Sequence, residues 1–352
     1  MTFQGERVRE SVGGNARGRW VAIRTSGSGS GLGDGSVASG YAGGGLRLIG
    51  EPGAALSREL TWRSTRWLIS ILLLVAWSLS GTALANEPES AGRSADSSDV
   101  IPLSVCVSQE GAVVFATRHG KHCIRYFTGG VVEDAPLVVI SFHGDRNPRA
   151  EAARDLAAMA EGRLSVANRL STLHRLPWIA VSRPGAYGSA GDHRKRRQLV
   201  EFEALNAVVD ALKDRYGFEQ VILIGHSGGA TVVGALLTLG RDDVRCAILT
   251  SVAVDFAERA RRLGWGSERV ERELAAYDPL DHVASVKEDP GRTVFIIGDP
   301  RDSNTPFELQ LRFAAVLRER GHRVEIVEAA GRPPRYHDLP GNAGAQLVSR
   351  CY

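Results

Sequence analysis

Short apolar runs alternate with longer amphipathic stretches along most of the chain after residue 100. Each of the runs at 137–142, 178–181, 221–224, 244–250, 294–297 and 323–328 predicts a strand. The stretches at 149–169, 196–215, 229–239, 306–319 and 342–349 predict helices between and after them. This alternation is typical of a parallel sheet covered by helices on both faces, which binds ligands beyond the carboxyl ends of its strands.

Two more strands are predicted ahead of this pattern, at 102–107 and 111–117, and a basic-rich stretch continues to about Phe127. Together they bring the sheet to about eight strands. Residues 254–290 lie between two of the strands, and helical stretches at 256–263 and 267–277 predict a small cap there. We therefore expect an α/β fold with a mostly parallel sheet, helices on both faces and a short cap.

The N-terminal part of the chain has a different composition. Residues 1–57 hold 15 of the 40 glycines and lack sustained apolar periodicity, so we predict a disordered extension or a segment upstream of the true start. A basic flank, the 15-residue apolar run at 67–81 and the small residues Ala83-Leu84-Ala85 follow. They predict a secretory signal peptide over about 58–85, cleaved after Ala85, and a folded domain over 86–352.

The alternative is a signal anchor that stays uncleaved, although the apolar run is shorter than the ~20 residues that span a bilayer core. With cleavage, the protein is periplasmic or secreted and has no stable membrane insertion. Because no methionine lies between Met1 and Met159, we expect translation to start at a non-Met codon near Leu56 or Leu60.

The chain of 352 residues is 43% hydrophobic and 24% charged, which is ordinary for a globular protein. Its 43 basic and 40 acidic residues give a net charge of +3, so no global electrostatic argument favours a nucleic acid partner. These values leave the oligomeric state open.

All four cysteines fall after the predicted cleavage site, and an even number in an oxidising compartment favours disulfides. Cys106 and Cys123 flank a predicted hairpin and are paired first, which leaves Cys246 for Cys351. In the alternative interpretation, Cys246 is a buried small hydrophobic residue. The sequence has no Cys-x-x-Cys or His/Cys cluster, so neither a metal nor another cofactor is predicted.

Gly225-His226-Ser227-Gly228-Gly229 joins the strand at 221–224 to the next predicted helix. A Gly-x-Ser-x-Gly sequence at such a turn holds its serine strained and exposed, so we predict Ser227 as a nucleophile. The helix N-terminus leaves the backbone N–H of Gly228 free to stabilise an oxyanion.

With this motif between a strand and a helix, most of 102–350 resembles the α/β-hydrolase superfamily. The resemblance implies an acid after a later strand and a base after the last one. Asp302 follows the strand at 294–297, and His337 follows the final strand within Tyr336-His337-Asp338. The order Ser227, Asp302, His337 is the order that this superfamily uses.

One departure from the family pattern keeps other residues under consideration. The gap between Gly298 and Asp302 is one residue longer than is common, so Asp299 stays a weaker candidate acid and Asp255 a weaker one still. For the base, His322 precedes the final strand, where we expect it to end a helix.

The first strand of the parallel set ends in Phe142-His143-Gly144-Asp145, which resembles the family's oxyanion loop. We expect the backbone N–H of Asp145 to be the second oxyanion donor, Gly144 to shape the loop, and His143 to make a structural hydrogen bond.

Residues 183–191 are similar to turns of dienelactone-hydrolase-like and prolyl-oligopeptidase-like members. There, Tyr187 either lines a substrate pocket or belongs to a tight loop. The basic run at 193–197 predicts a solvated helix start.

The sequence thus predicts an exported serine hydrolase that cleaves a carboxylic ester of a small acyl substrate through an acyl-enzyme. Two alternatives stay open on the same fold: a peptidase or amidase with the same triad, and a binding protein without catalysis. A third is a membrane-anchored interaction protein that uses the glycine-rich head.

Overall fold

The computed structural model of the chain describes residues 21–22, 100–152 and 155–352, all of which belong to one compact unit. The predicted signal peptide at 58–85 and nearly all of the predicted extension at 1–57 lie outside the described residues. None of the described helices is long and apolar enough to cross a membrane.

Eight strands form one sheet in the order β2-β3-β5-β4-β6-β7-β8-β9, and the two-residue β1 (Val21–Ala22) pairs with β9. Their bounds are β2 (Ala112–Thr117), β3 (Gly120–Gly129), β4 (Leu137–Phe142), β5 (Trp178–Val181), β6 (Gln220–His226), β7 (Val244–Thr250), β8 (Thr293–Gly298) and β9 (Arg323–Glu328). Strands β4 to β9 are mutually parallel, whereas β3 runs antiparallel to both β5 and β2. The predicted eight-stranded, mostly parallel sheet is confirmed.

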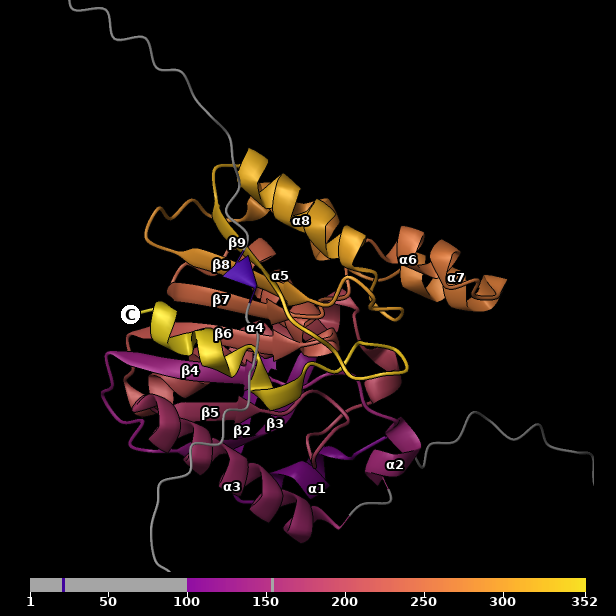
Figure 1. The fold of residues 1–352 in the computed structure, drawn as a ribbon. Helices are drawn as coiled ribbons and strands as arrows, with labels where there is room; N and C mark the ends of the chain where they lie inside the picture. Colours follow the sequence, from indigo (N-terminus) through magenta and orange to yellow (C-terminus); the bar gives the residue numbers. More distant parts are fainter. Residues whose placement is uncertain (1–20, 23–99, 153–154) are drawn as a thin grey trace, which may run out of the picture. The chain divides into compact units, whose positions relative to one another are not determined.

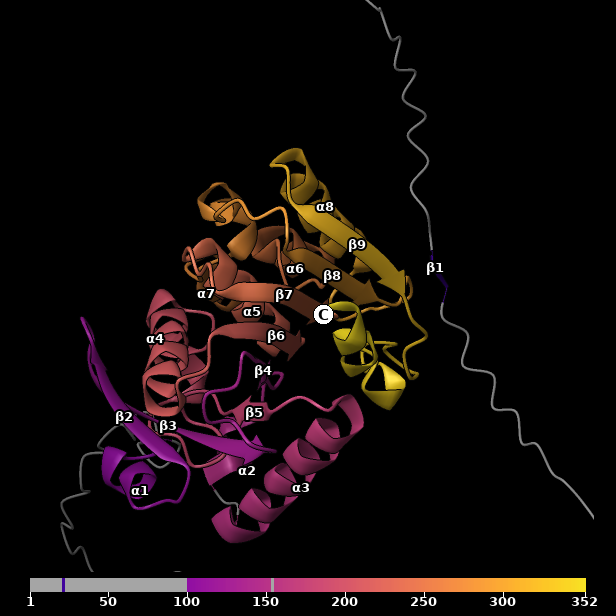
Figure 2. The same cartoon turned by 90° about the vertical axis from the view of Figure 1, so that its left-hand side faces the viewer.

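Helices cover both faces of the sheet (Figures 1 and 2). On one face lie α4 (Leu199–Tyr216), α5 (Gly228–Thr238) and α8 (Phe307–Glu319). On the other lie α3 (Leu156–His174) and the C-terminal 3-10 helix η5 (Ala345–Arg350). Successive side chains of a strand point to opposite faces of the sheet. Because helices cover both faces, the central strands are buried on both sides.

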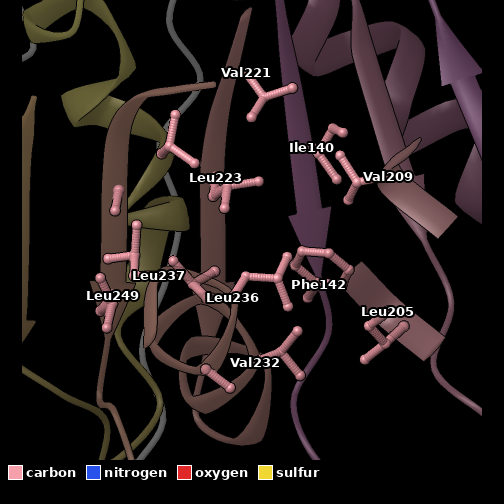
Figure 3. Close-up of a cluster of buried hydrophobic side chains, with 14 of the residues drawn as sticks. Ile140, Phe142, Leu205, Val209, Val221, Leu223, Val232, Leu236, Leu237 and Leu249 are labelled. Atoms are coloured by element: carbon pink, nitrogen blue, oxygen red, sulfur yellow. The ribbon is translucent and has the colours of Figure 1, made fainter. Parts of the chain in front are cut away.

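Strand β6 illustrates this burial. Val221 and Leu223 pack against α4 and α5, while Ile222 and Ile224 face the side of α3. Figure 3 shows the larger of the two clusters, where Leu223 lies beside Leu236 of α5 and Ile140 of β4. A continuous apolar strand is therefore what this position in the sheet requires.

Three predicted elements differ from the structure. Residues 102–107, predicted as a strand, form the single-turn helix α1 (Leu103–Val107), whose Cys106 is buried. A run this short fits either conformation by its pattern, and β2 takes β3 as its hydrogen-bonding partner instead. The helix predicted at 149–169 is divided into α2 (Pro148–Ala152) and α3, which is capped by the Asp155 carboxylate. The last helix is replaced by the 3-10 helices η4 (Pro340–Asn342) and η5.

Both predicted disulfides are present. Cys106–Cys123 joins α1 to β3, and Cys246–Cys351 joins β7 to the last residue but one, with Cα–Cα distances of 6.0 and 5.6 Å. The first pairing was correct although Cys106 lies on a helix rather than beside a hairpin strand.

Candidate active site

Ser227 lies at the turn from β6 into α5, which is the position that the Gly-x-Ser-x-Gly motif predicted. Its backbone has φ 53° and ψ −121°, a strained conformation for a residue with a side chain. The turn is tight: a Cβ on Gly225 would lie 2.2 Å from the carbonyl oxygen of Gly229. Only glycine fits at position 225, and the close turn sets Ser227 at the carboxyl edge of the sheet.

Asp302 and His337 come together at the same edge, from the segments that follow β8 and β9. The Nδ1 atom of His337 lies 2.8 Å from Oδ2 of Asp302, and the Thr305 hydroxyl donates to the same oxygen at 2.8 Å. Burial opposes ionisation of Asp302, but these hydrogen bonds and the neighbouring imidazole outweigh it and lower the pKa of the carboxyl. A proton on Nδ1 leaves Nε2 of His337 free to act as a base.

The ring of His337 also lies close to the nucleophile turn. Its centroid is 5.1 Å from that of His226, the residue immediately before Ser227. The Ser251 hydroxyl, at the end of β7, donates to the His337 carbonyl at 2.8 Å and fixes the backbone of this loop.

The other candidates occupy different positions. Asp299 accepts from Arg301 and from the backbone N–H of Gly331, so it organises its own loop. Asp255 pairs with Arg312 of α8. His322 is buried at the turn between α8 and β9. It therefore precedes β9, whereas His337 follows that strand.

The predicted oxyanion loop packs directly against Ser227. A Cβ on Gly144 would lie 3.4 Å from the Ser227 Cβ. Among the described residues, none accepts a hydrogen bond from the backbone N–H of Asp145 or of Gly228. Two backbone donors thus remain available on this side of the serine.

Two neutral histidines hold this loop in place. His143 accepts from the backbone N–H of Arg183 through Nε2 at 3.1 Å, and its Nδ1 lies 2.7 Å from the Gly144 carbonyl. His193 accepts from the backbone N–H of Arg146 at 3.1 Å, and its Nδ1 lies 3.0 Å from the Pro184 carbonyl. Burial and nearby arginines lower the pKa of His193 to about 4 and that of His143 well below its usual value. His143 therefore has the structural role that the sequence predicted.

The side chain of Asp145 is a feature that sequence reasoning missed. It bonds Arg183 at 2.8 Å and Arg197 at 2.6 Å, and Arg196 lies 3.2 Å away. Burial opposes ionisation, but these three charges hold the pKa of Asp145 well below its usual range. A Cβ on Gly228 would lie 2.0 Å from this carboxylate, which explains why the residue directly after Ser227 is a glycine.

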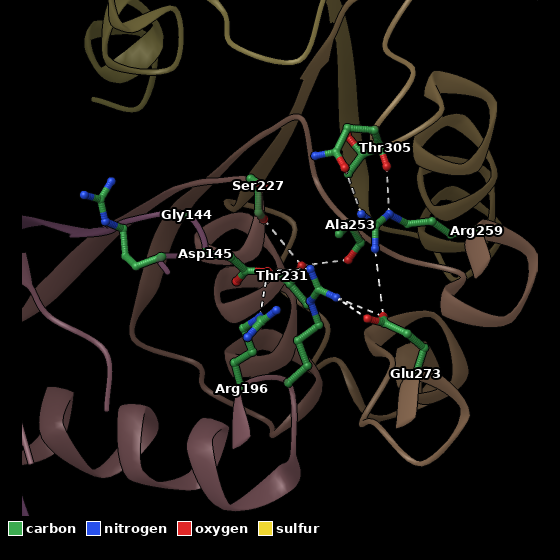
Figure 4. Close-up of polar contacts among 12 residues, drawn as sticks. Gly144, Asp145, Arg196, Ser227, Thr231, Ala253, Arg259, Glu273 and Thr305 are labelled. Atoms are coloured by element: carbon green, nitrogen blue, oxygen red, sulfur yellow. Dashed lines mark hydrogen bonds and ion pairs between the residues drawn. The ribbon is translucent and has the colours of Figure 1, made fainter. Parts of the chain in front are cut away.

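These contacts continue into the segment predicted as a cap. Arg197 binds Glu273 of α7 (Ser267–Leu274) at 2.8 and 2.9 Å, and Arg259 of α6 (Phe256–Arg262) binds the Asn304 carbonyl at 2.8 Å. Figure 4 shows the polar contacts that link Asp145 and Arg196, beside Ser227, with Glu273 and Arg259.

A search with protein-family models matched residues 175–286 to the α/β hydrolase fold, the segment that holds β5 to β7 and the serine turn. The strand order and the position of the turn agree with that match. The chain has the α/β-hydrolase fold. No curated protein sequence matches it.

Solved structures with this fold are similar at low identity. An acylaminoacyl peptidase of Pyrococcus horikoshii is 16% identical over 62% of this chain, with a TM-score of 0.44, and this chain spans only 36% of it. The esterase Pf2001 of Pyrococcus furiosus is 18% identical over 77% of this chain and 97% of its own, with a TM-score of 0.49. Est1E of Butyrivibrio proteoclasticus, solved with ferulic acid bound, is 16% identical over 68% of this chain and 95% of its own, also at 0.49.

Within this hydrolase fold, only Arg194 and Lys195 of the basic run at 193–197 are exposed as the predicted solvated helix start requires. His193 and Arg197 are buried, and Arg196 contacts Asp145. The available signal was the position of the run, since basic side chains ahead of a helix oppose its dipole and need another partner.

The turn at 183–191 behaves as a tight loop. Tyr187 is buried with φ 51°, and its ring meets that of His143 edge-on at 4.7 Å. Across the described residues, no group of His, Cys, Asp and Glu side chains could hold a metal ion.

Proposed function

We propose that this protein is an exported serine hydrolase that cleaves carboxylic esters through Ser227, His337 and Asp302. The observation that supports it most is the hydrogen-bonded pair of Asp302 and His337 beside a serine held at a positive φ. Asp302 and His337 lie 35 residues apart in the chain and meet where β8 and β9 end, and the His337 ring lies 5.1 Å from that of His226, the residue before Ser227.

In the proposed mechanism, the Ser227 hydroxyl attacks the ester carbonyl while Nε2 of His337 accepts its proton. Asp302 holds the imidazole in the required tautomer and stabilises the imidazolium. His337 then donates the proton to the leaving alcohol, and an acyl-enzyme forms on Ser227. Water attacks this ester by the same proton transfers and releases the acid.

The backbone N–H groups of Gly228 and Asp145 are the proposed oxyanion donors. A carboxylate so near the oxyanion would by itself oppose charge development there. The contacts of Asp145 with Arg183, Arg196 and Arg197 offset its charge, so the loop keeps its shape without adding net negative potential.

Export and the finer family placement belong to the same proposal. Two disulfides favour an oxidising compartment, because disulfides persist there and are rare in the cytosol. The tight turn at 183–191 supports a place in the dienelactone-hydrolase-like and prolyl-oligopeptidase-like branch.

Labelling with a fluorophosphonate tests the nucleophile directly. We expect the wild-type protein and Ser303→Ala to react, and Ser227→Ala to stay unlabelled; Ser303 is an exposed serine next to Asp302. Folded wild-type protein that does not react would favour the non-catalytic alternative. Rates with nitrophenyl esters against aminoacyl amides then separate esterase from peptidase, and faster amide cleavage would refute the ester assignment.

A further inference from the structure

A cavity of about 330 Å³ lies between α3, β5 and the C-terminal segment 338–345. Its walls are mostly apolar and include Leu170, Trp178, Ile224 and Leu339. This volume is enough for a small organic group rather than a single water molecule.

The cavity reaches the residues next to the candidate catalytic groups. His226, His143 and Asp338 line it, and they are the chain neighbours of Ser227, Gly144 and His337. One half of an ester bound at Ser227 can therefore extend into this space.

One wall of the cavity carries an arginine, Arg163, that forms no ion pair with the described residues. Arg163 of α3 is half-buried, and its guanidinium lies 4.9 Å from the ring centre of Tyr187 and 6.0 Å from that of Phe127. Within the described part of the chain, no side chain forms an ion pair with it, and its buried Nε has no hydrogen-bond partner. Burial lowers the pKa of Arg163, and the attraction of the Glu151 carboxylate, which binds Arg146, offsets only part of this effect.

The contrast with the other arginines near the serine is informative. Arg183 and Arg197 are more deeply buried, and each binds two carboxylates. Asp338 lines the same cavity as Arg163, but it is 72% exposed and lies 3.5 Å from His226. An arginine that makes no ion pair with a described residue, in a cavity whose walls are mostly apolar, is the arrangement that receives a ligand's anionic group.

We infer that the substrate is an ester with a carboxylate on one of its two halves, and that Arg163 binds this carboxylate inside the cavity. The inference rests on the proposed function, since the ester group is placed at Ser227. The apolar walls accommodate the short stem between the ester and the carboxylate.

Matched esters test the inference. On the acyl side, 4-nitrophenyl hydrogen glutarate is compared with 4-nitrophenyl valerate, which carries a methyl group in place of the carboxylate. On the alcohol side, 3-carboxyphenyl butyrate is compared with phenyl butyrate. In at least one pair, we expect the wild-type protein to show kcat/KM roughly tenfold or more in favour of the charged ester.

The ratio of the two kcat/KM values should fall by roughly tenfold or more in Arg163→Gln and by less in Arg163→Lys. The control Arg169→Gln removes the same charge from an exposed position of the same helix and should keep the wild-type ratio. Because each ratio is taken on one preparation, loss of folded protein cancels.

Equal rates for charged and neutral esters in the wild-type protein, in both pairs, would overturn this inference and leave the serine hydrolase intact. A charged-ester preference that Arg163→Gln retains would also overturn it. Absence of any ester hydrolysis by the wild-type protein would overturn the proposed function first, and the inference with it.

Discussion

The two sides of Ser227 are built in different ways. On one side, Asp302 and His337 form a short hydrogen-bonded pair supported by the hydroxyls of Thr305 and Ser251 and by backbone N–H groups. On the other, the loop after β4 is fixed by two neutral histidines and a carboxylate among three arginines. The first arrangement uses one charge, whereas the second uses at least four.

The difference follows from what is fixed on each side of Ser227: one imidazole ring on the first side and a stretch of loop backbone on the second. In the proposed mechanism, His337 needs its proton kept on Nδ1 and its ring fixed, and one carboxylate does both by accepting a hydrogen bond from that nitrogen. In the same proposed mechanism, the loop at 143–147 presents backbone N–H groups without being part of a helix or strand. Its shape therefore depends on side chains from elsewhere, and buried ion pairs provide strong, directional contacts when each charge has a partner. Changes on the first side should impair activity, and changes on the second should impair stability as well.

The largest effect is expected at the acid. Asp302→Asn keeps the size of the side chain but cannot hold the required tautomer of His337, so kcat should fall by about 10⁴-fold. Asp299→Asn, in the same loop but bonded to Arg301, serves as the control and should stay within about tenfold of the wild type. Ester hydrolysis under saturating substrate measures both. Similar losses in the two variants would refute the assignment of Asp302 as the acid.

A smaller but still large effect is expected at Asp145. Asp145→Ala leaves three arginines without their shared partner, and we expect the free energy of unfolding to fall by roughly 3–5 kcal/mol. Urea unfolding measures this change. The control Asp242→Ala breaks an exposed pair with Lys287 and should lower the free energy of unfolding far less. Equal costs would show that the buried network adds no special stability.

The smallest effect is a pH dependence on the same side. Because the pKa of His193 is lowered to about 4 in the folded protein, the unfolded chain binds a proton first as the pH falls. Stability should therefore decrease from about pH 6.5 towards pH 4, by up to roughly 3 kcal/mol from this residue, with His143 adding to it.

His193→Gln removes this contribution and should reduce the dependence of stability on pH. Urea unfolding of the wild type and the variant at a series of pH values measures the change. An unchanged slope in His193→Gln would contradict the view that this histidine must stay neutral to hold the loop.

Much of the fold was predictable because its signals are local. The apolar runs gave the six parallel strands, and the glycines around Ser227 fit a turn in which a Cβ at 225 would clash. Even the pairing of Cys106 with Cys123 was predictable, although the conformation around Cys106 was not. A five-residue apolar segment satisfies a helix and a strand equally well until its neighbours are known.

The identity of each charge's partner was decided only in three dimensions. From the sequence alone, Asp302 was favoured over Asp299 only through the resemblance to the superfamily, and 193–197 resembles a surface run. Yet Asp302 meets His337 and Arg197 meets Asp145, because strands distant in the chain end side by side. The spacing of apolar residues and glycines determines where the chain turns and what it buries. Which ions meet depends on the juxtaposition of those turns, and no local pattern encodes it.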